Sequence, residues 1–215
     1  METGANRIRR VHGAAALLLG VPMGAIGASL MKHGSFGLTP FYSVSLVLNK
    51  VTGLFTMGTW NTIFQVVLVL TLAIIRRKVT PRYFLAFLVS VWSSVILDIA
   101  NSVTGGFPED MATRIICFIA GFLILGMGIS LLARCRMPVA PMNLFPRELA
   151  EVYHRSFKEF KLWFDIGCLI FTVVISFAVK HRLIGCGIGT FAAVLIGPLT
   201  GVIIGWLDRH FEFYV

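Results

Sequence analysis

The stretch IICFIAGFLILGMGISLLA, residues 115–133, decides the fold class of this protein. Its 19 residues carry no charge, and a helix of that length crosses most of the roughly 30 Å hydrocarbon core of a bilayer. Four other apolar stretches are at least as long: residues 13–31, 54–75, 83–103 and 183–207. A fifth, residues 162–179, is shorter and carries Asp165 near one end. The sequence therefore predicts an all-α membrane protein with six transmembrane helices.

The overall composition agrees with this reading. Hydrophobic residues make up 57% of the 215 and charged residues 13%, against about 25% charged in soluble domains, and the mean hydropathy is +0.84. The predicted spans take more than half of the chain, so no length remains for a catalytic domain outside the membrane. No P-loop, nucleophile elbow or H-E-x-x-H motif occurs. We therefore expect no enzyme, no cofactor and no metal site.

The distribution of basic residues predicts the orientation. With the N-terminus inside, 14 of the 19 lysines and arginines fall on the cytoplasmic side and 5 outside. Cytoplasmic loops carry the lysine and arginine excess in membrane proteins, so both termini are expected in the cytoplasm. The net charge of +9 then reflects topology rather than nucleic-acid binding. The apolar stretch 13–31 exceeds a typical signal-peptide core and reads as a retained first span.

The chain contains a weak internal repeat. G-A-S-L at residues 27–30 returns as G-I-S-L at 128–131, and Pro40 returns as Pro141, both 101 residues later. Trp60 and Trp163 each open an apolar span at an offset of 103. Each copy holds three spans, and an odd number reverses direction, so residues 1–110 and 111–215 are predicted to be inverted halves of one membrane domain. Inverted repeats are typical of secondary transporters.

Two segments do not read as ordinary spans. Residues 36–49 contain a proline-initiated helix of half a bilayer's length, and both a re-entrant and an interfacial placement stay open. Its counterpart, residues 137–146, is proline-rich and is left with the same two placements. Residues 147–161 then read as one amphipathic helix along the cytoplasmic face, with Glu151 and Arg155 paired at i, i+4.

Polar residues inside the predicted spans are few, and such residues are expensive and usually functional. Asp98 lies in the outer third of the third span, and Asn61 and Gln65 share one face of the second. We interpret Asp98 as a proton- or cation-coupling carboxylate, with a structural role in a polar cluster between helices as the alternative. For Asn61 and Gln65 the structural role is the preferred interpretation, and hydrogen bonding to a substrate or ion is the alternative. The candidate substrate- or ion-binding residues are Asp98, Asn61, Gln65, Thr39, Pro40 and Asn101.

Small residues predict where helices pack closely. Gly20, Gly24 and Ala28 recur at a spacing of four on the first span, which places them on one face. Glycines are also frequent in the last span, residues 183–207. The small-residue face of the first span is expected to contact another helix, and a homodimer is a further assembly left open.

Several of these motifs resemble the bacterial YczE/YitT-type membrane proteins. The resemblance rests on G-I-G-T at 187–190, G-P-L at 197–199, and the segments 27–30 and 37–40. It implies a multi-pass protein of the bacterial inner membrane without an established substrate. One departure is Thr200, which stands where the resemblance leads us to expect an aspartate, while Asp98 lies near the equivalent place in the first repeat.

These observations favour a small-solute transporter, secondary and proton- or cation-coupled, that lies in the lipid bilayer and binds an unidentified solute. The first alternative is a membrane-embedded substrate-binding subunit of a multi-protein importer, which would dock its partners on the small-residue face or on residues 147–161. The second is an accessory membrane protein that transports nothing. A co-purifying ATPase would distinguish the first alternative from a transporter that works alone.

Overall fold

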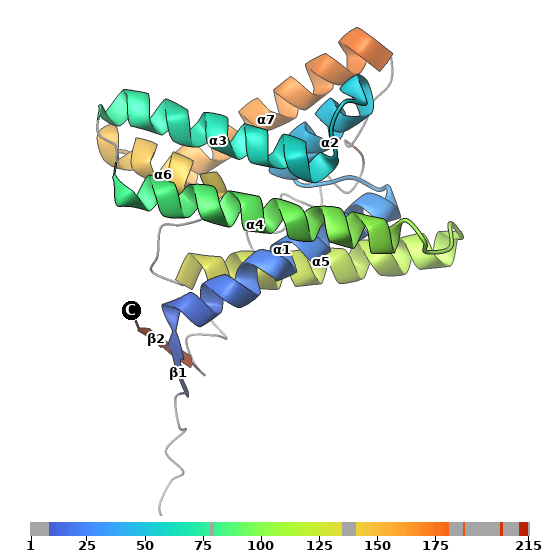
Figure 1. Ribbon diagram of the computed structural model, residues 1–215, viewed down its shortest axis with the longest axis horizontal. Coiled ribbons are helices and arrows are strands. Elements are labelled where there is room, and N and C mark those ends of the chain that lie inside the picture. The colour runs from blue at the N-terminus through green and yellow to red at the C-terminus, as the bar shows by residue number, and fades with distance from the viewer. Residues whose placement is uncertain are drawn as a thin grey trace, which may run out of the picture.

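The computed structural model describes residues 9–77, 80–134, 141–180 and 211–214, together with residues 187 and 203. Seven helices and two short strands lie in these ranges (Figure 1). They are β1 (Arg9–His12), α1 (Gly13–Gly34), α2 (Pro40–Thr52), α3 (Met57–Arg76), α4 (Pro81–Thr104), α5 (Met111–Arg134), α6 (Pro141–Val152), α7 (Phe157–Lys180) and β2 (Phe211–Tyr214).

Five of the described helices are long and apolar enough to cross a membrane. The segments are Ala15–Gly34, Met57–Arg76, Pro81–Thr104, Met111–Leu132 and Phe157–Val179. They match the first five predicted spans, and the sixth prediction, residues 183–207, lies almost wholly outside the described residues. Large apolar side chains cover their outer surfaces while serines, threonines and amides are buried inside. This distribution is that of a multi-pass membrane protein, whose outer surface meets lipid.

Helices α1 and α5 pack closely through glycines. A Cβ added to Gly27 would lie 2.8 Å from the Gly121 carbonyl oxygen, and one added to Gly20 would lie 3.0 Å from the Gly128 oxygen. Backbone atoms cannot yield as side-chain ends do, so these positions need glycine for the two helices to approach. The predicted packing face on the first span is confirmed, with Gly27 as a contact that the spacing of four did not include.

Helix α2 is enclosed by other helices. It begins at Pro40, as predicted, although the Thr39 side chain makes no capping hydrogen bond. Seven consecutive residues, 41–47, are buried, and the helix packs on α3 and α7. Ser43 and Thr172 join α2 to α7 through their hydroxyl oxygens, 3.0 Å apart. A helix that lies flat on a membrane surface exposes one polar face, and α2 has none over this stretch.

The predicted amphipathic helix over residues 147–161 is wrong. Helix α6 starts at Pro141, with Pro146 inside it, and ends at Val152. His154 is left-handed (φ 50°), and the Arg155 N–H donates to the Ala150 carbonyl at 2.9 Å. This is the pattern of a Schellman turn, which stops a helix. Glycine usually occupies the left-handed position, so a histidine there leaves little trace in the sequence.

Helix α7 starts earlier than predicted, because the chain resumes helical geometry immediately after that turn. It runs for 24 residues from Phe157, so the shorter predicted span, residues 162–179, is only its apolar part. Asp165 lies inside this helix and pairs with Lys161 one turn earlier at 2.5 Å. The Lys161–Asp165 pair is partly buried, which fits a charge pair near the end of a span.

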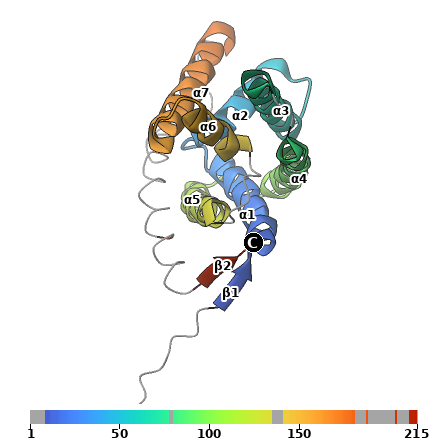
Figure 2. The same ribbon diagram turned by 90° about the vertical axis from the view of Figure 1, so that its left-hand side faces the viewer.

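The strands β1 and β2 join the two ends of the chain. They pair in parallel, with Arg9 opposite Phe211 and His12 opposite Tyr214. Figure 2 shows the pair side by side below α1 and α5. Residues near both termini therefore lie next to each other, at the end of the bundle where α1 starts.

Candidate functional site

Helices α3 and α4 meet along a seam that contains three of the predicted site residues. At one end of the seam, Gly58 lies so close to α4 that an added Cβ would collide with the Ser94 carbonyl oxygen and the Asp98 carboxylate. The Gly58 N–H donates to Asp98 Oδ1 at 2.7 Å, and the Thr56 hydroxyl donates to Asp98 Oδ2 at 2.5 Å. Because the first N–H groups of a helix have no partner within it, Asp98 satisfies one of them and places negative charge where the helix dipole favours it.

The two predicted amides lie deeper in the same seam. Asn61 is 0% and Gln65 4% exposed. Asn61 donates from Nδ2 to the Ser94 hydroxyl at 3.1 Å, and Gln65 donates from Nε2 to the Ser93 hydroxyl at 3.4 Å. The Asn61 Oδ1 atom is buried and, across the described residues, has no hydrogen-bond partner. An acceptor left unpaired in an apolar interior costs about 1–3 kcal/mol, so this oxygen is available to a donor that enters the seam.

Asn101 joins α4 to α1 at the same end of the bundle as Asp98. Its Oδ1 accepts from the Ser29 hydroxyl and from Lys32 Nζ, each at 3.0 Å. The Ser29 hydroxyl also lies 2.9 Å from the Thr104 hydroxyl. Two donors on one amide oxygen fix the orientation of the Asn101 side chain. Lys32 is not among the predicted site residues, because a lysine near the end of a span resembles an ordinary loop charge.

Thr39 and Pro40 lie in a different environment. Their carbonyl oxygens accept from Ser43, at 3.0 Å from its N–H and 2.7 Å from its hydroxyl. Next to them, the Phe41 ring lies 5.5 Å from the Phe64 ring centroid. No hydrogen bond between Asp98 and Thr39 or Pro40 is present in the described part of the chain. Asp98, Asn61 and Gln65 thus form the polar seam between α3 and α4. Asn101 borders this seam where α4 meets α1, and the start of α2 is apart from it.

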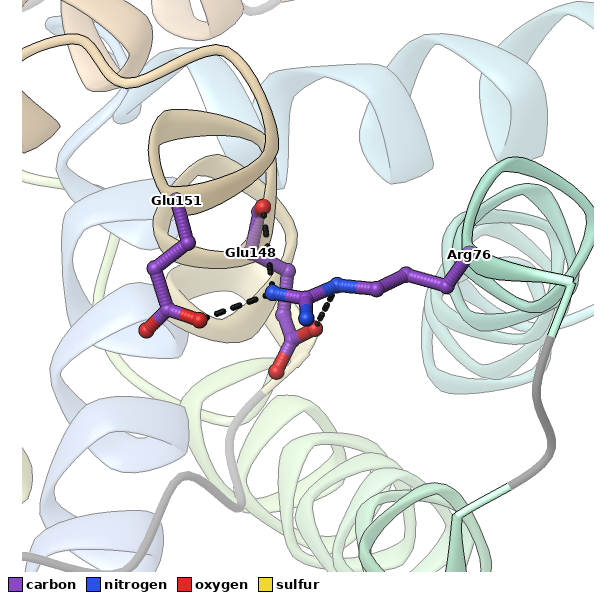
Figure 3. A network of polar contacts seen from close by, with 3 residues as sticks. All are labelled: Arg76, Glu148 and Glu151. Carbon is purple, nitrogen blue, oxygen red and sulfur yellow. Dashed lines mark hydrogen bonds and ion pairs between the residues drawn. The ribbon is translucent and has the colours of Figure 1, made fainter.

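A second charged group lies at the opposite end of α3. Arg76 Nε is 2.6 Å from Glu148 Oε2, and its Nη2 is 2.7 Å from Glu151 Oε2 (Figure 3). The predicted Glu151–Arg155 pair is therefore wrong: Glu151 points across to α3. The Glu148 side chain is 11% exposed, and breaking a nearly buried ion pair is costly. The group ties α6 to the end of α3.

The described part of the chain contains neither a group of metal-ligating side chains nor a disulfide. Within the described ranges, no three histidine, cysteine or acidic side chains are grouped as metal ligands would be. Cys117 and Cys168 are buried free thiols. Cys135 and Cys186 lie outside the described residues.

Comparison with known proteins places the chain in a family without an assigned activity. It is 22% identical over 196 residues to an uncharacterized protein, YyaS, of Bacillus subtilis strain 168, and the match covers 90% of this chain and 92% of that protein. No solved structure matches the chain. The resemblance to YczE/YitT-type proteins is supported at the coarser level of a multi-pass membrane family of unknown function with a bacterial relative. The model of the family DUF6198, a family of unknown function, matches residues 11–209, and the protein belongs to this family.

Proposed function

We propose that this protein is a secondary transporter for a small solute, built from two inverted three-helix repeats with both termini in the cytoplasm. The observation that carries the proposal is a reciprocal set of contacts between α1 and α5. The sequence motifs relate the two halves by an offset of 101 residues. A two-fold axis between the halves requires that each contact recur with its partners exchanged under that offset.

The glycine contacts meet this requirement atom by atom. A Cβ on Gly20 would lie 3.0 Å from the Gly128 oxygen, and the exchanged contact, from Gly121 to the Gly27 oxygen, is 2.7 Å. A Cβ on Gly27 would lie 2.8 Å from the Gly121 oxygen, and its counterpart, from Gly128 to the Gly20 oxygen, is 2.9 Å. The offset came from the G-x-S-L motifs and not from these contacts, so the agreement supports the inverted repeat independently.

The packing of the other helices follows the same exchange. Under the repeat, α2 corresponds to α6 and α3 to α7, and both short helices begin with a proline, Pro40 and Pro141. Helix α2 packs on α7, and α6 packs on α3. The parallel pairing of β1 with β2 brings residues near both termini together, which is compatible with the proposed six spans, since an even number leaves both ends on one side. Inverted repeats with buried half-length helices are the architecture of many secondary transporters.

The polar seam between α3 and α4 is the proposed site of solute and ion contact. The buried Asn61 oxygen lacks a donor among the described residues, and Gln65 holds only a long hydrogen bond of 3.4 Å. Asp98 is partly exposed, and its two hydrogen bonds leave lone pairs for a cation or proton. We also propose that α2 is a re-entrant helix. A relation of this chain to the YczE/YitT-type proteins is likewise proposed.

A metabolite screen followed by uptake tests the proposal. Purified protein is scanned by thermal shift against a metabolite library, and the hits are tested for uptake into proteoliposomes with and without a proton or sodium gradient. We expect Asp98→Asn to fold, because the side chain keeps its shape and one acceptor, and to lose gradient-driven uptake. Asp110→Asn, an exposed acid outside the spans, is the control. Normal gradient-driven uptake by Asp98→Asn would refute the coupling role, and co-purification with an ATPase would favour the importer-subunit alternative.

The orientation has its own test. In a variant whose cysteines are replaced by serine, single cysteines at positions 78 and 109 are labelled in intact cells with a membrane-impermeant maleimide. The excess of basic residues on one side predicts that position 109 is labelled and position 78 only after permeabilisation. Labelling of position 78 from outside would reverse the proposed orientation.

A further inference from the structure

Lys32 is a partly buried cation that forms no ion pair with the residues that the structure describes. It lies in the last turn of α1, inside a segment long enough to span the membrane. Across the described ranges its ammonium group donates to the neutral Asn101 Oδ1 at 3.0 Å, and no carboxylate there lies within 4.0 Å of it. An ammonium group has three donors, so the described residues leave two of them unused.

The surroundings of Lys32 hold it inward. Asn101 Oδ1 also accepts from the Ser29 hydroxyl, and Ser29, which is fully buried, contacts Thr104. These neutral groups connect α1 to α4 and fix the amide that receives the lysine. A lysine near a span end commonly extends to the lipid headgroups, whereas Lys32 turns toward the α1–α4 contact.

The charges around Lys32 do not neutralise it. Lys50, exposed at the end of α2, repels it electrostatically, and Asp98 attracts it. Both Asp98 oxygens are already engaged by the start of α3. Among the described residues, two positive charges thus face one carboxylate, and charged groups inside a membrane are normally paired.

We propose that Lys32 binds the carboxylate group of the transported solute, with Lys50 attracting the anion at the rim of the site. This inference rests on the proposed transport function and names the substrate class, an organic anion. The two unused Lys32 donors fit the two oxygens of a carboxylate, and the bound anion supplies the missing partner. Inorganic phosphate and phospholipid headgroups share the negative charge, and they are separate arms of the test.

Thermal unfolding of the purified protein in a zwitterionic detergent tests the inference. The probes are sodium acetate, sodium succinate, sodium phosphate and added phosphatidylglycerol, with sodium chloride at equal ionic strength as reference. We expect acetate or succinate to raise the melting temperature of the wild type and of Lys32→Arg. Lys32→Gln should need about ten times more carboxylate or beyond, as the loss of one charged hydrogen bond implies. Lys158→Gln, an exposed lysine on α7, should behave as wild type.

Asn101→Asp keeps the test decisive if Lys32→Gln does not fold. The new carboxylate takes the place of the amide that Lys32 contacts, so the ion pair forms within the protein and the variant should be folded but unresponsive to acetate and succinate. A carboxylate response that survives in Asn101→Asp, or that needs no more carboxylate in Lys32→Gln than in the wild type, overturns the inference. So does a wild type that responds equally to chloride, or only to phosphate or phosphatidylglycerol.

Uptake measurements separate this inference from the transport proposal. Carboxylate binding that depends on Lys32 without any uptake in proteoliposomes would leave the anion site standing and refute transport. Gradient-driven uptake of a solute without an anionic group, unchanged in Lys32→Gln, would support transport and refute the anion site.

Discussion

Replacing Gly27 with alanine should push α1 and α5 apart. The added Cβ would lie 2.6 Å from the Leu125 nitrogen and 2.8 Å from the Gly121 oxygen. Both atoms belong to the backbone, so relief comes only from moving a helix. Reaching ordinary contact at 3.4 Å requires a local separation of about 0.8 Å. Over-packing of this kind costs about 1–3 kcal/mol.

The matched control is Gly24→Ala on the same helix, where the nearest atom to the added Cβ is the Tyr42 hydroxyl oxygen at 3.7 Å. Alanine favours a helix over glycine by roughly 0.5–1 kcal/mol, and this gain is common to both variants. The difference between them therefore reports the collision alone. For a chain of this length about 1 kcal/mol corresponds to 2–4 °C, so Gly27→Ala should melt roughly 2–12 °C below Gly24→Ala.

Thermal unfolding in detergent measures the difference, and Gly128→Ala completes the test. Its Cβ would lie 2.7 Å from the Gly24 nitrogen, the contact that the 101-residue offset pairs with Gly27 and Leu125, so it should lose as much stability as Gly27→Ala. Gly27→Ala melting together with Gly24→Ala would refute the close packing. A large loss in one glycine variant and none in its counterpart would refute the two-fold relation.

Three further predictions concern the polar contacts. Arg76→Gln should lower the free energy of unfolding by about 1.5–3 kcal/mol, because it leaves two carboxylates of α6 unpaired, while the exposed Arg82→Gln should change little in the same urea titration. Thr56→Val should cost about 1–2 kcal/mol in that titration, since the hydroxyl caps α3 and donates to a carboxylate; no loss would contradict this. Asp110 accepts from the side chain and N–H of Thr113, which lowers its pKa, so its stabilising effect is present above the unfolded-state pKa and is lost as the pH falls through the folded one. The melting temperature of Asp110→Asn should therefore decrease less than that of the wild type between pH 7 and about 3. Glu109→Gln is the control and should follow the wild type.

The proposed internal repeat rests on a sequence pattern of low specificity. The G-x-S-L motifs supplied the offset, and the α1–α5 contacts between Gly20, Gly27, Gly121 and Gly128 agree with it. Small residues on a helix face reveal that a neighbour comes close, but not which helix it is. The identity of that neighbour depends on contacts about 100 residues apart in the chain.

The contacts of charged and polar side chains are harder to predict from the sequence. Asp98 and Asn61 were found because polar atoms inside apolar stretches are conspicuous, while Lys32 at the end of a span was not. The pairing of Arg76 with Glu151 joins residues 75 positions apart, and no local spacing rule predicts it. Local rules instead favoured the incorrect Glu151–Arg155 pair.

The sequence by itself determined the membrane-spanning class, five of the spans and the proline at which α2 begins, because span length, hydropathy and proline geometry are local properties. Only the tertiary structure decided that α2 is enclosed over residues 41–47, that α6 ends at a left-handed His154, and that Asp98 caps α3. These features depend on which helices meet, and that is set by packing of side chains and backbone across the bundle rather than by any one segment.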